Sequence, residues 1–170
     1  MAWKFTGKFG KGIWTEMRIT VLAAGKIREK WLVDGIEEYA KRLKRYCEVN
    51  MIEVQDSPEY LPPETILAQE GERLLAKIRE KAYVALLDLH GKEIDSVSFA
   101  ELMDKSFEVG GAEIIFVIGG SSGVSEELRR RADLRICLSK LTFTHQITRL
   151  LLLEQCYRGF RILRGEPYHK

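Results

Sequence analysis

The sequence has little cysteine and no long apolar run. Its three cysteines, Cys47, Cys137 and Cys156, lie far apart and form no CxxC pair, so we expect reduced core thiols in a cytoplasmic protein rather than a metal or redox site. The longest apolar runs, such as residues 114–118, have the length of a strand and fall far short of the ~20 residues that span a membrane. A chain of 170 residues fits one domain and needs no disulfide or metal to hold it together.

The sequence also lacks the motifs of several enzyme classes. It contains no GxxxxGK[ST] segment, which argues against a P-loop NTPase, and no GxSxG elbow, which argues against the usual α/β-hydrolase. The first apolar run ends at a single glycine, Gly25, where a dinucleotide site or a classical Rossmann methyltransferase requires a glycine-rich turn. The histidines, His90, His145 and His169, are not at ligand spacing and have no acidic cluster beside them, so no metal site is predicted.

Apolar runs alternate with amphipathic stretches from Met17 onward. Five predicted strands are each followed by a predicted helix, which indicates a single α/β domain with a mostly parallel sheet and helices on both faces. The predicted strands are 18–23, 49–54, 83–89, 114–118 and 134–139. The predicted helices are 29–46, 65–81, 98–109, a short one after Ser125, and 144–163.

Local signals predict where several elements begin and end. Ser98 and Glu101 match a capping box at the start of a helix, and Ser125 is expected to cap the next one. Gly91 is expected to end the third strand. Three of the four prolines fall in residues 55–64 and exclude regular structure from most of that loop.

The last predicted helix is apolar around almost its whole circumference. Leucines occupy residues 150–153, and Ile147, Tyr157 and Phe160 add to two faces. A helix of this kind is buried on more than one side. In the outer layer of a sheet a second buried face requires a partner subunit, so a homodimer is predicted.

Charge is distributed unevenly along the chain. Residues 128–170 hold ten Lys or Arg and three Asp or Glu, a balance of +7, whereas residues 17–127 carry −7. A bound polyanion and a solvated basic helix explain this pattern equally well. Residues 1–16 have no signal-peptide pattern, and we interpret them as an appendage outside the fold, with a basic-aromatic arm that touches nucleic acid as the alternative.

Two loops at predicted carboxyl ends of strands carry the strongest hint of a site. Residues 119–123 read GGSSG, and glycines let a ligand approach the backbone closely, although a simple tight turn has the same pattern. Residues 138–143 mix small hydroxyls with apolar side chains. Side by side, the two loops can form a pocket for an uncharged ring such as adenine. Glu154 and Arg158, four residues apart, fit either an exposed helical pair or a buried functional pair.

These loops resemble the bacterial large-subunit rRNA pseudouridine N3-methyltransferases, of the SPOUT class of knotted methyltransferases. The likeness spans residues 17–170 and is carried by segments 19–26, 118–123, 138–146, 154–158 and 167–170. It implies a trefoil knot over about residues 114–165, an obligate homodimer, S-adenosylmethionine as cofactor, and a pseudouridine in helix 69 of 23S rRNA, within assembled ribosomes, as substrate. Thr144 stands where the family usually has proline.

The resemblance also implies a set of site residues. The cofactor is expected against Leu87, Gly119, Gly120, Leu138, Ser139, Lys140, Leu141, Thr142 and Phe143. The residues expected to position the base or take its proton are His169, Tyr168, Arg158 and Glu154. Two other functions fit the same sequence, namely a SPOUT methyltransferase acting on tRNA and a non-catalytic ribosome-binding protein with this fold.

Overall fold

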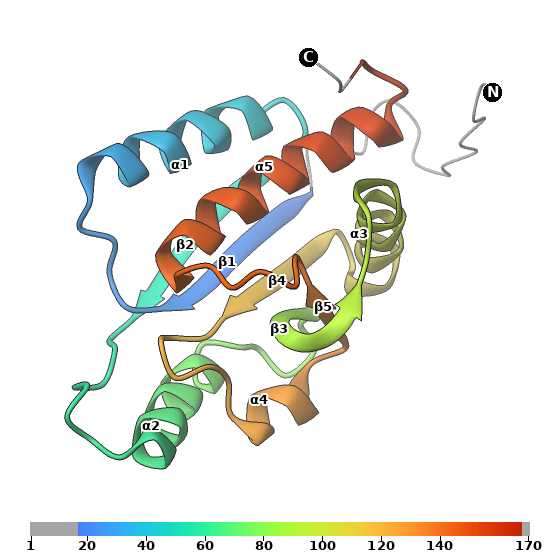
Figure 1. Cartoon of the computed structure of the whole chain (residues 1–170). Helices are drawn as coiled ribbons and strands as arrows, with labels where there is room; N and C mark the ends of the chain where they lie inside the picture. Colours follow the sequence, from blue (N-terminus) through green and yellow to red (C-terminus); the bar gives the residue numbers. More distant parts are fainter. Residues whose placement is uncertain (1–16, 168–170) are drawn as a thin grey trace.

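The computed structural model describes residues 17–167 and has a five-stranded, wholly parallel sheet (Figure 1). Its strand order is β2-β1-β4-β3-β5. The strands are β1 (Arg18–Ala24), β2 (Glu48–Val54), β3 (Val84–Glu93), β4 (Glu113–Ile118) and β5 (Leu134–Cys137). The predicted α/β class and parallel sheet are confirmed. The predicted appendage, residues 1–16, lies outside the described residues.

Within residues 17–167, five helices cover the two faces of the sheet. They are α1 (Lys30–Leu43), α2 (Pro63–Leu75), α3 (Ser96–Gly110), α4 (Glu126–Arg131) and α5 (His145–Leu163). Helices α1, α3 and α5 pack on one face, and α2 and α4 pack on the other (Figure 1). No helix in residues 17–167 is long and apolar enough to cross a membrane.

Strand β4 lies at the centre of the sheet and links two apolar clusters. Ile114, Phe116 and Ile118 belong to the cluster beneath α1, α3 and α5. Ile115 and Val117 belong to the cluster beneath α2 and α4. Successive side chains of a strand point to opposite faces, which explains why a central strand is apolar at every position. The core is therefore continuous through β4.

Two predicted helix starts were wrong, for identifiable reasons. Helix α2 begins at Pro63, inside the predicted loop, because the first turn of a helix tolerates a residue without an N–H donor. It ends at Leu75, six residues before the predicted end at Lys81. Helix α3 begins before Ser98, because Asp95 is its N-cap and accepts a 2.7 Å hydrogen bond from the Ser98 backbone N–H.

Strand β3 does not end at Gly91 as predicted but continues to Glu93 through a bulge. Ile136 of β5 is paired with both Leu87 and Lys92, so residues 88–91 are looped out of the ladder. A Cβ at Gly91 would lie 2.7 Å from the backbone N of Ile136. The glycine is therefore needed for the close approach of two strands and not to terminate one.

Helix α5 lies between α1 and α3 and is the longest helix (Figure 1). Thr144 caps it and accepts a 3.3 Å hydrogen bond from the Ile147 backbone N–H, so threonine serves the position where the family usually has proline. Leu152 and Leu153 are fully buried, whereas Leu151 and Tyr157 remain half-buried in the single subunit. One face of α5 is thus fully buried within the subunit, and another remains partly exposed.

Candidate active site

A cavity of about 940 Å³ lies at the carboxyl ends of β3, β4 and β5. Its walls come from the bulge of β3, the glycine turn after β4, the loop after β5 and the first turn of α5. This volume is typical of a small-molecule site. The carboxyl edge of the strands is also where doubly wound sheets bind their ligands.

The structure brings together most of the residues predicted to hold a cofactor. Those that line the cavity are Leu87, Gly119, Gly120, Leu138, Ser139, Leu141, Thr142 and Phe143. Lys140 is not among the lining residues, and its Nζ lies 3.4 Å from Glu93 Oε2. The role of the eight lining residues in cofactor binding stays a prediction. That they meet at one cavity does not follow from their spacing in the sequence alone.

The glycine turn after β4 is tightly constrained. The Gly123 backbone N–H donates to the Gly120 carbonyl oxygen at 3.1 Å, and Gly123 has a φ of +97°, a conformation that favours glycine. A Cβ at Gly119 would collide with the Gly123 carbonyl oxygen and lie 2.7 Å from Val124 Cγ1. The turn therefore requires glycine at both ends.

The loop after β5 presents apolar side chains at the cavity. Leu141 and Phe143 are 71% and 44% exposed, and Leu89 of the β3 bulge is 59% exposed, although all three line the cavity. The Ser139 hydroxyl accepts a 3.0 Å hydrogen bond from the Leu141 backbone N–H and thereby shapes the loop. Exposed apolar residues gathered around one cavity are typical of a ligand site.

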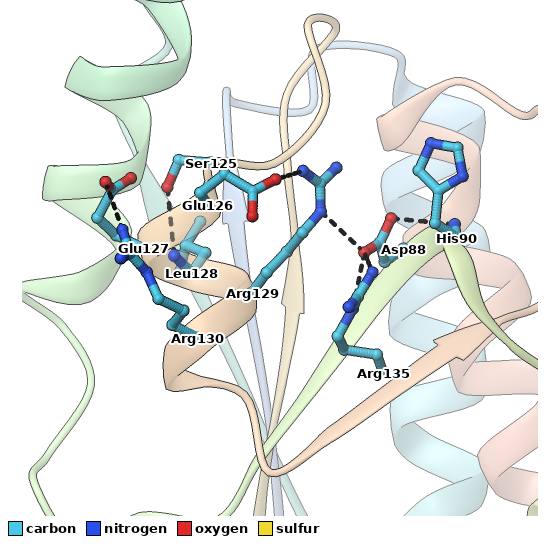
Figure 2. Close-up of polar contacts among 9 residues, drawn as sticks. All are labelled: Asp88, His90, Ser125, Glu126, Glu127, Leu128, Arg129, Arg130 and Arg135. Carbon is cyan, nitrogen blue, oxygen red and sulfur yellow. Dashed lines mark hydrogen bonds and ion pairs between the residues drawn. The ribbon is translucent and has the colours of Figure 1, made fainter.

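Asp88 fixes the bulge of β3 through bonds on both carboxylate oxygens. Its Oδ1 accepts from the His90 backbone N–H at 3.1 Å, within the looped-out segment. Its Oδ2 accepts from Arg129 Nε at 3.0 Å and from Arg135 Nε at 3.0 Å. Figure 2 shows the carboxylate between the two guanidinium groups, one from α4 and one from β5. One buried acid thus joins the bulge of β3 to α4 and β5.

The electrostatics of Asp88 favour its charged form. Burial opposes ionisation, but the hydrogen bonds from the His90 backbone, Arg129 and Arg135 outweigh it, and the pKa of Asp88 lies below its ordinary value. The Asp88 side chain is only 2% exposed. Asp88, Arg129 and His90 also line the cavity and were missed as site residues, because a lone Asp ending an apolar strand gives no motif.

The first turns of α5 are tied to the end of β1 by Arg149. This arginine is fully buried, and it donates to the carbonyl oxygens of Ala24 and Gly25 at 2.7 Å and 2.8 Å. It also pairs with Glu53 at 2.7 Å. His145, one turn earlier, lines the cavity. Burial and the charge of Arg149 lower the pKa of His145, so its imidazole is neutral at pH 7.

The predicted catalytic residues are only partly placed. Glu154 Oε1 lies 2.7 Å from Arg158 Nη2, and their side chains are 24% and 29% exposed. The pair is therefore formed and partly buried, but it lies further along α5 than the residues that line the cavity. Tyr168 and His169 lie outside the described residues.

The basic C-terminal quarter is largely neutralised by nearby carboxylates. Every arginine between residues 128 and 164 forms an ion pair with Asp or Glu. Several of the partners, such as Asp88 and Glu126, precede that quarter. The count along the sequence therefore overstates the positive charge available to a polyanion. Within residues 17–167, no group of three or more His, Cys, Asp or Glu is arranged to hold a metal ion.

Comparison with known proteins defines the class. A family described as predicted SPOUT methyltransferase matches residues 17–169. The chain also resembles the solved tRNA (m1G37) methyltransferase of Aquifex aeolicus, with a TM-score of 0.51 and 19% identity over 92% of this chain and 75% of that one. The structural likeness concerns the fold alone. The chain belongs to the SPOUT methyltransferase family, as the resemblance of its loops indicated.

Closer relatives narrow the assignment within that class. The chain is 48% identical to the ribosomal RNA large subunit methyltransferase H of Clostridium kluyveri, over 91% of this chain and 100% of the relative. It is 49% identical to the protein of the same name from Desulfitobacterium hafniense, over 91% of this chain and 99% of the relative. These matches place the chain among the methyltransferases H of the ribosomal RNA large subunit.

Replacing Asp88 by Asn is expected to lower the free energy of unfolding by about 1–3 kcal/mol at pH 7, because two charge-assisted bonds are weakened in a buried position. Asp88 has a lowered folded pKa, so its stabilisation is present above the unfolded pKa and is lost as pH falls through the folded pKa. The difference in free energy of unfolding between the wild type and Asp88→Asn should therefore shrink as pH falls. Urea denaturation of both proteins from pH 7 to pH 3 measures this change.

Asp104→Asn is the matched control. Burial, with the charge of Glu108, raises the pKa of Asp104, so the charged form is disfavoured in the folded state and its loss costs little at pH 7. Equal destabilisation by the two variants, or an Asp88→Asn effect that persists unchanged at pH 3, would contradict the role of the charged Asp88 carboxylate.

Proposed function

We propose that this enzyme transfers a methyl group from S-adenosylmethionine to N3 of a pseudouridine in helix 69 of 23S rRNA, within assembled ribosomes in the cytoplasm. The observation that carries the proposal is the near-half identity to large-subunit rRNA methyltransferases over 91% of the chain. The cavity at the strand ends is the proposed site for the cofactor of such an enzyme. The pseudouridine and helix 69 rest on the resemblance of the loop and tail motifs.

The cavity suits S-adenosylmethionine by size and by lining. Adenine is an uncharged flat ring, and Leu87, Ile118, Leu138 and Phe143 offer apolar surface of the required kind. The Gly119–Gly120 backbone offers polar groups without side chains in the way. When bound, the cofactor supplies an electrophilic methyl group on a sulfonium that is its own leaving group.

The residues of the chain then have two tasks, to position the attacking nitrogen and to accept its proton. Methyl transfer requires the attacking nitrogen held in line and near contact with the methyl carbon. As the N3–carbon bond forms and the carbon–sulfur bond breaks, the N3 proton must pass to an acceptor. His169 is the proposed acceptor, with Tyr168 beside it in the tail. Arg158, oriented by its 2.7 Å contact with Glu154, binds a phosphate or a base oxygen.

The proposed working unit is a homodimer with a trefoil knot over about residues 114–165. The support for a partner is the face of α5 that the subunit leaves half-buried, which includes Leu151 and Tyr157. The Glu154–Arg158 pair also lies on α5 beyond the cavity lining, as expected of residues that complete a site near a subunit interface. The ribosome is the proposed partner in the cell.

Cofactor binding is expected to fail when the glycine turn is filled. Gly119→Ala collides with the Gly123 backbone, and Gly120→Ala with the Glu70 carboxylate, so each should weaken S-adenosylmethionine by at least about tenfold in calorimetric titration. Gly35→Ala is the control, because its Cβ meets only the flexible end of Leu150, at 3.3 Å, in the α1–α5 contact. Unchanged affinity in both turn variants would contradict this placement of the cofactor.

His169→Ala is expected to bind S-adenosylmethionine with wild-type affinity and to lose about 10²–10⁴-fold in the single-turnover rate of rRNA methylation, the usual contribution of a general base. Raising the pH should partly restore the rate, because the N3 proton is then lost to solvent. A variant that keeps full turnover would remove His169 from the mechanism.

A further inference from the structure

Glu70 is a buried carboxylate beside the glycine turn, and it is not among the residues that line the cavity. It lies on α2 one turn after Leu67, which lines the cavity, and it is only 4% exposed. Its Oε1 accepts a 2.9 Å hydrogen bond from the Ser57 backbone N–H. Its Oε2 is buried and has no hydrogen-bond partner within residues 17–167. A buried oxygen without a partner is unfavourable unless something else compensates it.

The Glu70 carboxylate rests directly against Gly120. A Cβ at Gly120 would collide with Oε2 and lie 3.0 Å from Cδ. Gly120 is not one of the glycines with positive φ, so the reason for a glycine here is the close approach of the acid. Gly120 also lines the cavity. It therefore places no side chain between the carboxylate and the space where the cofactor is proposed to bind.

The arginines on neighbouring elements hold other partners. Arg73, on the same helix, donates to the Gln55 carbonyl oxygen at 3.0 Å and to Ser57 Oγ at 2.9 Å. Arg149 pairs with Glu53 and with the end of β1. In the described part of the chain, Glu70 forms no ion pair. The described part of the chain thus gives this carboxylate one hydrogen bond, from Ser57, and no cationic partner.

The charge of Glu70 reaches the cavity. His145 lines the cavity, and burial lowers its pKa, as does Arg149, while the negative charges of Glu70 and Asp56 act in the opposite direction. Asp56 lies close to His145 at the end of β1. A Cβ at Gly25 would be 3.5 Å from Asp56 Oδ2 and 3.3 Å from His145 Nε2. Charges interact strongly where water is excluded.

We propose that Glu70 is a positioning residue that selects the cationic methyl donor over the uncharged product of the reaction. The inference rests on the proposed function, in which a sulfonium becomes a thioether when the methyl group leaves. A negative charge behind Gly120 stabilises the sulfonium form and offers nothing to the thioether. It thereby favours binding of fresh donor and release of S-adenosylhomocysteine, and it acts without touching the reacting atoms.

Calorimetric titration of Glu70→Gln with both ligands tests this. Gln keeps the size of the side chain and an oxygen for the Ser57 N–H but removes the charge. We expect the affinity for S-adenosylmethionine to fall about tenfold and that for S-adenosylhomocysteine to change less than about twofold. Glu70→Asp, which keeps a charge, should retain most of the preference. Glu72→Gln, an exposed neighbour on α2, is the matched control and should bind both ligands normally.

The outcomes separate this inference from the proposed function. Equal losses for the two ligands in Glu70→Gln would show a purely structural role, and no loss for either would show that the charge is not felt; both overturn the assignment of Glu70 while leaving the methyltransferase intact. Failure of the wild-type protein to bind either ligand would overturn the proposed function and this inference with it. Thermal unfolding of each variant confirms that it is folded.

Discussion

The cavity depends on the hydrogen bonds that the buried guanidinium of Arg149 donates to the end of β1. This arginine joins the first turns of α5, the last helix within residues 17–167, to the carbonyl oxygens at the end of β1, the first strand in that range. Removing one partner of a buried charge costs about 3–5 kcal/mol, so this contact fixes the position of α5 strongly. The wall that holds Thr144, His145 and Thr148 is placed by it. Asp88 has the corresponding role on the other side, where it joins β3, α4 and β5.

The layered fold was predictable because its signals are local. The apolar run at 114–118 predicted a strand, which is β4. Ser125 caps α4 as predicted, and the glycine turn and the next loop do meet at one cavity. Errors arose where two signals competed. Ser98 resembled a cap, but Asp95 three residues earlier binds its N–H, and Gly91 resembled a strand end although it permits close strand packing.

The parts that sequence reasoning missed depend on contacts between distant segments. Glu70 and Gly120 are fifty residues apart and meet only because α2 packs behind the turn after β4. The Asp88 cluster likewise unites residues of β3, α4 and β5, and no spacing rule connects them. Nor did counting charges along the sequence anticipate that the arginines after residue 128 form ion pairs with carboxylates from several elements. The resemblance of the motifs predicted the reaction and its cofactor, whereas the structure identified the side chains that surround the cavity.

Methylation of large-subunit rRNA at this cavity can be measured as methyl transfer to purified ribosomes. Ribosomes lacking the modification would be incubated with the protein and isotopically labelled S-adenosylmethionine, with free tRNA assayed in parallel. We expect one labelled methyl group per ribosome, on N3 of a helix 69 pseudouridine, and none on tRNA. Label on tRNA alone, or cofactor binding without transfer to either RNA, would contradict it.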